Sequence, residues 1–325
     1  MHAWQFDSYG HYTKVLNWVE RAVPTPGPGQ ALVRTAAVSL NFPDLLIIQG
    51  MYQHKAPLPA VPGVEGVGVV EATGPGSKFK VGDRVVGFCH SGGTLADYFL
   101  VDNKAAWTVP AHVTDEVAAA LSVTYGTSWF GLTHRAHLKA GETLLVLGAA
   151  GGVGLAAIQL GKLLGAKVIA CAGDARKLEV CRQHGAEHLV NYRDEDLVER
   201  VKAITGGEGA NVIYDPVGGD IFDKVKRCVA WDGRIVIIGF AGGRIPQLEM
   251  NRVLLKNMSV VGLAWGQYLD RGMREPEEAQ YLFYDMIARR QIDPVIYQTL
   301  PFAETKEGLR IIESREVYGK VVITR

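Results

Sequence analysis

The segment Ala149–Gly154 combines residue types and a spacing that suit the binding of a phosphate group. It lies within LLVLGAAGGVGLAAIQLGKLLGA (residues 144–166), between an apolar run of strand length and a segment of helix length. Two adjacent glycines let the backbone approach a pyrophosphate, a third lets the helix lie close to the strand, and the helix N-terminus attracts phosphates. We predict that a dinucleotide contacts this turn, whose residues are Ala149, Ala150, Gly151, Gly152, Val153 and Gly154. Because Ala149 departs from the strict GxGxxG pattern, a purely structural turn stays open as an alternative.

The end of the next strand indicates which nicotinamide cofactor is bound. NAD-specific sites usually place Asp or Glu there, to bond the ribose 2′-hydroxyl. Here the strand ends at Gly173, and the following turn carries Arg176 and Lys177. The space at Gly173 and the charge of Lys177 suit a 2′-phosphate, so we predict NADPH in preference to NADH. Asp174 keeps NADH open, because its carboxylate can also bind the ribose.

The rest of the second part of the chain must position this turn. From about residue 121, apolar runs of strand length alternate with amphipathic segments of helix length. The expected strands are TLLVLG, KVIACAG, HLVNY, NVIYD and RIVIIGF, with MSVVGLAW as a sixth. This alternation predicts an α/β fold, a doubly wound parallel sheet with helices on both faces. We expect residues 121–294 to form this dinucleotide-binding domain.

Residues 1–120 follow a different pattern. Short β-like runs such as ALVRTAAVSL and VEGVGVVEAT are separated by the turn signals PTPGPGQ and TGPGSK. They predict an irregular, barrel-like β domain. The tail contains an acidic helix, ETKEGLRIIESR, and a strand, KVVITR, which we expect to return to this domain. The second domain is therefore predicted as residues 1–120 plus 295–325.

Composition excludes several classes of protein. The 325 residues carry no net charge, which gives no electrostatic reason to expect nucleic acid or an anionic membrane as a partner. No apolar run is long enough for a transmembrane helix, and the N-terminus lacks the pattern of a signal peptide. Four scattered cysteines form no CxxC pair. They favour buried thiols in a reduced cytoplasm over disulfides or structural zinc.

Several longer motifs carry a resemblance to a known family. They are PTPGPGQALVRTAAVSLNFPDLLIIQGMY, VPGVEGVGVVEATG, VGDRVVGF, DPVGG (215–219), VIIGFAGG (236–243) and YGKVVI (318–323). With these motifs the chain resembles the medium-chain dehydrogenases/reductases along essentially its whole length. Within them it is similar to the zinc-free quinone oxidoreductase branch, which includes zeta-crystallin. The resemblance implies a Rossmann domain, a GroES-like β domain and a homodimer that pairs through the MSVVGLAW strand.

The resemblance also bears on zinc. Zinc-dependent members carry a cysteine three residues before the aspartate that matches Asp44, and a histidine in a GHE motif. This chain has Asn41 and Val64 at these places. Valine cannot ligate a metal and a neutral amide is a poor zinc ligand, so we expect no catalytic zinc. Without a Lewis acid, the hydride acceptor must already be electron-poor, as a quinone or a conjugated double bond is.

The family's functional positions can be carried over to this chain. The resemblance implies that Asn41 and Tyr52 line the cleft between domains and bind the acceptor or the nicotinamide; the alternatives are a turn cap and an edge packing residue. Thr127 is implied at the nicotinamide, the alternative being a helix-start cap. The other implied cofactor contacts are Tyr192 and Arg315 near the 2′-phosphate, Gly239, Phe240 and Ala241 along the cofactor, Leu263 over the nicotinamide, and Lys320.

Three functions follow, from two classes of protein. The first is an NADPH-dependent reductase of quinones. The second is an NADPH-dependent enoyl-thioester (2-enoyl-CoA) reductase, which uses the same hydride geometry on a carbon–carbon double bond. The third is a non-catalytic nucleotide- or RNA-binding protein. Zero net charge and the lack of a basic patch with interleaved aromatic residues argue against the RNA-binding alternative.

Overall fold

The chain divides into two compact units. The computed structural model describes all 325 residues. The α/β unit contains Thr124–Trp265 and Arg289–Asp293, and the β unit contains Met1–Val123, Gly266–Ala288 and Pro294–Arg325. The structure thus places Gly266–Ala288, which was predicted in the dinucleotide-binding domain, in the β unit.

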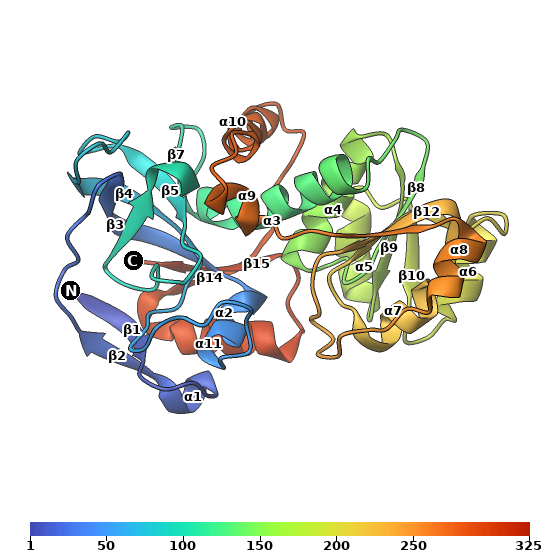
Figure 1. Cartoon of the computed structure of the whole chain (residues 1–325), viewed down its shortest axis with the longest axis horizontal. Helices are drawn as coiled ribbons and strands as arrows, with labels where there is room; N and C mark the ends of the chain where they lie inside the picture. Colours follow the sequence, from blue (N-terminus) through green and yellow to red (C-terminus); the bar gives the residue numbers. More distant parts are fainter. The chain divides into compact units, whose positions relative to one another are not determined.

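A parallel sheet forms the centre of the α/β unit. Its strands are β8 (Thr143–Val146), β9 (Lys167–Ala172), β10 (His188–Asn191), β11 (Ala210–Asp215), β12 (Val229–Ile237) and β13 (Ser259–Gly262). They pair in the order β10-β9-β8-β11-β12-β13, and every pair is parallel. Figure 1 labels β8, β9, β10 and β12 of this sheet. All six predicted strands are present. The sheet confirms the predicted Rossmann architecture.

Helices cover both faces of this sheet because successive residues of a strand point to opposite sides. On one face, Leu145 and Ile213 share a core with residues of α6 and α7. On the other face, a Cβ on Gly161 of α4 would lie only 2.5 Å from the Leu144 side chain. The Tyr214 hydroxyl is hydrogen-bonded to the hydroxyl of Ser128 in α3. The helices are α3 (Asp115–Phe130), α4 (Gly152–Leu163), α5 (Ala175–Gln183), α6 (Leu197–Ile204), α7 (Gly219–Val225) and α8 (Met250–Lys256).

The β unit is built on a second sheet. Its strands β3 (Gln30–Leu40), β4 (Glu65–Thr73), β5 (Arg84–Phe88), β7 (Ala106–Thr108), β14 (Ile296–Pro301) and β15 (Lys320–Thr324) pair in the order β14-β15-β3-β4-β5-β7, and β6 (Tyr98–Asp102) pairs with β3. The tail returns here as predicted, since Val322 of β15 lies opposite Ser39 of β3.

Other elements of the β unit were not predicted from sequence. They are the hairpin β1 (His2–Phe6) and β2 (Leu16–Glu20) with α1 (Tyr12–Val15), and α2 (Phe42–Ile48), α9 (Gly266–Asp270) and α10 (Glu275–Ala288). The predicted acidic helix is α11 (Thr305–Ser314). Helix α10 joins this unit through Lys78, which pairs with Glu277 at 2.8 Å, and through Thr108, whose hydroxyl lies 3.3 Å from that of Tyr281. No helix has the length and apolar character required to cross a membrane.

Candidate functional site

The carboxyl ends of the parallel strands bring most predicted cofactor residues to one edge of the α/β unit. The glycine turn follows β8, Gly173 follows β9 and Tyr192 follows β10. Gly239 lies just beyond β12, and Leu263 directly follows β13. The strand order reverses between β8 and β11, and open α/β sheets bind their ligands at such a switch point. We call this edge, with the loops that follow its strands, the carboxyl edge.

The glycine turn has the shape that close approach requires. A Cβ on Gly154 would lie 2.5 Å from the carbonyl oxygens of both Gly148 and Ala149, so only glycine lets α4 begin this close to β8. Gly148 has a positive φ of 56°, which L-residues with a side chain rarely adopt. Gly151 is the N-cap residue of α4 and provides no side-chain cap. The first N–H groups of α4 are therefore left to a ligand or to water.

Two side chains from the loop after β10 lie against the end of β9. A Cβ on Gly173 would be 2.6 Å from the Tyr192 hydroxyl oxygen and 3.1 Å from Arg193 Nε. Gly173 therefore gives these side chains the room to reach the end of β9, where the adenosine ribose of a Rossmann ligand lies. Arg193 was not predicted from the sequence. The only available signal was its place directly after Tyr192.

Asp174 and Lys177 are engaged with each other beside this position. The Asp174 carboxylate is the N-cap of α5, and its Oδ1 accepts a hydrogen bond of 2.9 Å from Lys177 N–H. Its Oδ2 lies 3.8 Å from Lys177 Nζ. A carboxylate that caps a helix and faces an ammonium is less available to ribose hydroxyls. This geometry weakens the argument for NADH that rested on Asp174.

The loops after β11 and β12 are bonded side by side. Asp215 ends β11; its Oδ1 accepts 2.8 Å bonds from the N–H groups of Val217 and Gly218, and its main-chain oxygen accepts from Ile238. Asp215 is fully buried, its Oδ2 has no protein partner, and burial raises its pKa. The Phe240 ring lies against Gly218, where a Cβ would be 2.9 Å away. The predicted contacts from Gly239 to Ala241 thus lie along the DPVGG turn.

Two further predicted residues occupy distinct places in the α/β unit. Thr127 lies near the C-terminal end of α3, well inside the helix, so the alternative role of helix-start cap is wrong. Leu263 donates its N–H to the oxygen of Ile237 at 3.1 Å. A Cβ on Gly131 would lie 3.6 Å from Leu263 Cδ2. Leu263 therefore belongs to the hydrophobic packing near the end of β12.

The β unit holds Asn41 in a buried polar cluster, which we call the Asn41 network: Asn41, Asp44, Glu65 and Lys320. Asn41 is 6% exposed and is the N-cap residue of α2. Its Nδ2 donates to the Ser39 carbonyl at 3.1 Å and to Glu65 Oε1 at 2.9 Å. Its Oδ1 accepts from Lys320 Nζ at 2.5 Å. Both amide hydrogens are therefore used within the protein.

The charged members of the network are also engaged. Lys320 Nζ donates to Leu40 O at 3.0 Å as well as to Asn41, and lies 3.3 Å from Glu65 Oε1. A cofactor contact by this ammonium would require one of these bonds to break. Burial lowers the pKa of Lys320 and raises that of Asp44 to about 7, although Asp44 accepts bonds from the N–H groups of Asn41 and Gly63.

Tyr52 and Arg315 complete the predicted set in the β unit. Tyr52 packs against the hydrophobic core of this unit; burial, and then the charge of Asp44, raise its pKa. A phenol can donate a hydrogen bond. Arg315 ends α11 in a left-handed conformation with φ of 58°. The structure thus groups Tyr52, Asn41 and Lys320 around Asp44, whereas Arg315 stands at the end of a helix.

Comparisons with known proteins agree with this geometry. The family described as alcohol dehydrogenase GroES-like domain matches residues 27–111, and the zinc-binding dehydrogenase family matches residues 152–282. A quinone oxidoreductase-like protein 2 of Rattus norvegicus is 44% identical over 311 residues, covering 94% of this chain and 88% of the relative. Quinone oxidoreductase 1 of Escherichia coli (strain K12) is 34% identical over 317 residues, covering 95% of each. The crystal structure of an Escherichia coli quinone oxidoreductase complexed with NADPH has a TM-score of 0.92 at 32% identity and covers 100% of both chains.

Proposed function

Because the chain belongs to the medium-chain dehydrogenase/reductase superfamily, in its quinone oxidoreductase branch, we propose that it is an NADPH-dependent reductase of quinones or similar electron-poor conjugated acceptors. The observation that carries this proposal is the carboxyl edge. There Gly154 lets α4 begin close to β8, the start of α4 leaves N–H groups for a pyrophosphate, and Lys177, Tyr192 and Arg193 come from the segments that follow β9 and β10. The similar structure with bound NADPH supports the same choice of cofactor.

We propose that the cofactor lies along the carboxyl edge. The turn Ala149–Gly154 would hold the pyrophosphate, with Gly173, Lys177, Tyr192 and Arg193 around the 2′-phosphate. Charged hydrogen bonds to a phosphate are worth about 1.5–3 kcal/mol each, enough to separate NADPH from NADH by roughly tenfold or more. The other proposed contacts are Thr127, Gly239, Phe240, Ala241 and Leu263, together with Arg315 from the β unit.

We propose that catalysis needs no zinc. Val64 cannot ligate a metal and Asn41 is a poor ligand. In addition, Asn41 Oδ1 already accepts from Lys320 Nζ. An ammonium at this position repels a second cation in a buried setting. The acceptor must therefore be activated by its own conjugation, which is why a quinone fits better than a simple ketone.

The bound nicotinamide would supply a hydride, and the chain's own residues orient the acceptor, exclude water and supply a proton. We assign the hydrogen bond to the acceptor oxygen to Tyr52, because the family resemblance implies that it lines the acceptor site and a phenol can donate a hydrogen bond. Asn41 has no amide hydrogen left to donate. Its role is therefore the placement of Lys320 and of the start of α2.

Steady-state NADPH oxidation with a simple quinone and with a 2-enoyl-CoA, measured side by side, tests the proposed reaction. We expect turnover of the quinone, and a loss of kcat/KM of about tenfold in Tyr52→Phe with an unchanged KM for NADPH, as for one lost hydrogen-bond donor. Activity on the thioester alone would replace the quinone by the enoyl-thioester. NADPH binding without turnover of either would leave a nucleotide-binding protein.

We also propose a cytoplasmic homodimer. Strand β13 pairs with β12 on one side only and is an edge of the parallel sheet. Nearby, α8 buries none of its residues; Leu254 is 78% exposed and Leu255 71% exposed. An open strand edge beside exposed leucines favours pairing with a second copy of the chain. Light scattering of wild type and of Val260→Lys in β13 tests this: the variant should become a monomer. Wild type that is already monomeric would reject the proposal.

A further inference from the structure

A long loop on the carboxyl edge has few apolar anchors. The segment from Ile238 to Glu249, between β12 and α8, has no regular structure and contains Gly239, Phe240 and Ala241. Most of its residues after Ala241 are exposed, and Ile245 is 69% exposed. A segment with so little buried apolar surface opens easily unless polar contacts hold it.

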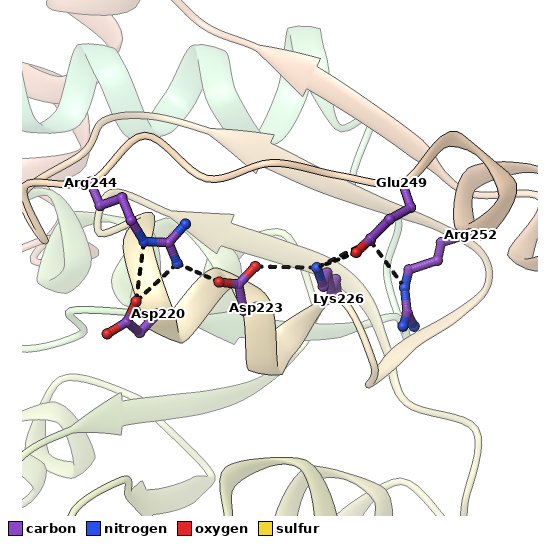
Figure 2. Close-up of polar contacts among 6 residues, drawn as sticks. All are labelled: Asp220, Asp223, Lys226, Arg244, Glu249 and Arg252. Carbon is purple, nitrogen blue, oxygen red and sulfur yellow. Dashed lines mark hydrogen bonds and ion pairs between the residues drawn. The ribbon is translucent and has the colours of Figure 1, made fainter.

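A chain of ion pairs connects this loop to α7. Figure 2 shows Asp220, Asp223, Lys226, Arg244, Glu249 and Arg252, which we call the loop clasp. Arg244 Nη2 lies 2.9 Å from Asp220 Oδ1 and also bonds Asp223. Lys226 Nζ lies 3.2 Å from Asp223 Oδ1 and 3.1 Å from Glu249 Oε2. Arg244 in the loop and Glu249 at its end are thus both attached to the same side of α7.

One buried member, Lys226, makes the clasp stronger than an ordinary surface pair, whereas the Asp223 and Arg244 side chains are 40% and 47% exposed. The Asp220 side chain is 95% exposed, so its pair with Arg244 contributes little. By contrast, the Lys226 side chain is 9% exposed and shares Asp223 with Arg244. Water and salt screen the charges of a partly buried network less than those of an isolated exposed pair. Asp223 is therefore the residue on which the clasp depends.

The clasp acts next to the backbone that faces the proposed cofactor. The main-chain oxygen of Arg244 accepts from Gly219 N–H at 3.0 Å, and Val217 O accepts from Gly242 N–H at 2.7 Å. Ala241 N–H donates to Pro216 O at 3.1 Å. Movement of Arg244 away from α7 would therefore also pull on the segment Gly239–Ala241.

We propose that Arg244 and Asp223 are positioning residues for cofactor binding: the loop clasp sets the conformation in which Gly239–Ala241 faces the nicotinamide half of NADPH. This inference rests on the proposed function, because it takes NADPH as the ligand of the carboxyl edge. Strand β12 lies on the opposite side of β8 and β11 from β9 and β10. Loss of the clasp should therefore weaken the hold on the nicotinamide half and spare the adenosine half.

Calorimetric titration of Asp223→Asn and Arg244→Ala with NADPH, and with adenosine 2′,5′-bisphosphate, tests the proposal. We expect the Kd for NADPH to rise about tenfold, the scale of one charged hydrogen bond. The bisphosphate would contact only the glycine turn after β8 and the loops after β9 and β10, so its Kd should stay within twofold. Arg244→Lys should recover most of the NADPH affinity, since an ammonium still pairs with Asp223.

Arg182→Ala is the matched control, because Arg182 forms an exposed pair with Glu179 on α5, at 2.6 Å, away from the loop. Its NADPH affinity should equal that of the wild type. Unchanged NADPH affinity in Asp223→Asn, or equal weakening for NADPH and the bisphosphate, would overturn the role of the clasp. The bisphosphate titration also shows that each variant is folded. Failure of the wild type to bind NADPH would instead reject the proposed function.

Discussion

The carboxyl edge and the Asn41 network hold most of the predicted functional residues, and their polar groups are used in opposite ways. At the carboxyl edge, helix α4 starts at a glycine without a side-chain cap, which leaves its first N–H groups to a ligand or to water. In the Asn41 network, both amide hydrogens of Asn41 are bonded and Lys320 meets three acceptors. The first region leaves N–H groups and space for a ligand, whereas the polar groups of the second are hydrogen-bonded to one another. Family resemblance identifies residues in both regions. Only their contacts in the structure distinguish residues that are available to a ligand from residues that support the fold.

Removal of the buried Lys320 ammonium should give the largest change, a loss of stability. Such a loss would show that the Asn41 network supports the fold. Lys320→Met leaves the fully buried Glu65 carboxylate without its cationic partner. Breaking a buried pair in this way costs about 3–5 kcal/mol of unfolding free energy, measured by urea denaturation. Lys320→Met combined with Glu65→Gln should recover part of that loss. A decrease no larger than that in Arg310→Ala, which breaks an exposed pair with Glu307, would contradict a supporting role for the network.

A methyl group in the glycine turn should act on binding. The Cβ of Gly154→Ala would meet two carbonyl oxygens at 2.5 Å, so α4 must move away from β8 and its N–H groups from the pyrophosphate. We expect the Kd for NADPH to rise about a hundredfold, or ~2.7 kcal/mol, by calorimetry. Gly262→Ala, whose Cβ would meet nothing within 4 Å, is the control. Equal affinity in the two variants would leave the turn with a purely structural role.

The cations near Gly173 should distinguish the two nicotinamide cofactors. Lys177→Ala and Arg193→Ala should each raise the KM for NADPH roughly tenfold and leave that for NADH nearly unchanged, since only NADPH carries the 2′-phosphate. Arg182→Ala on α5 provides a comparison in which neither KM changes. If both cofactors were affected equally, these side chains would act on the fold and not on the phosphate.

Asp44 should give an effect of another kind, a dependence of stability on pH. Burial raises its pKa in the folded chain to about 7, above the unfolded value of 3.8. Between these values the folded state binds the extra proton, so stability falls as pH rises from about 4 to about 7, by at most about 1.4 kcal/mol per pH unit. Urea denaturation across this range should show a shallower slope in Asp44→Asn. Identical slopes would mean that Asp44 titrates normally.

The carboxyl edge was predictable from sequence because its determinants are local. Strand periodicity fixed where β8 ends, and Gly154 stands where only a hydrogen atom fits. Arg193 escaped prediction because nothing in the residues NYRDED shows which side chains turn toward Gly173. The loop clasp joins α7 to residues up to 24 positions away through side-chain geometry that no spacing rule encodes.

The Asn41 network was not predicted from the sequence as a cluster. Family resemblance pointed separately to Asn41 and Lys320 as ligand contacts. Their bonding partners come from segments far apart in the sequence, with Lys320 and Glu65 separated by 255 residues. Helix α10 gives the same lesson, because its assignment to the β unit depends on contacts with Lys78 and Thr108. Pairings over such distances follow from the tertiary fold and leave no periodic signal in the sequence.

Calorimetric titration of the wild-type chain with NADPH and with NADH decides whether the carboxyl edge binds a nicotinamide dinucleotide by its phosphates. We expect NADPH to bind at least about tenfold more tightly than NADH, the contribution of a charged hydrogen bond to the 2′-phosphate. Absence of binding by both, or NADH binding as tightly as NADPH, would contradict it.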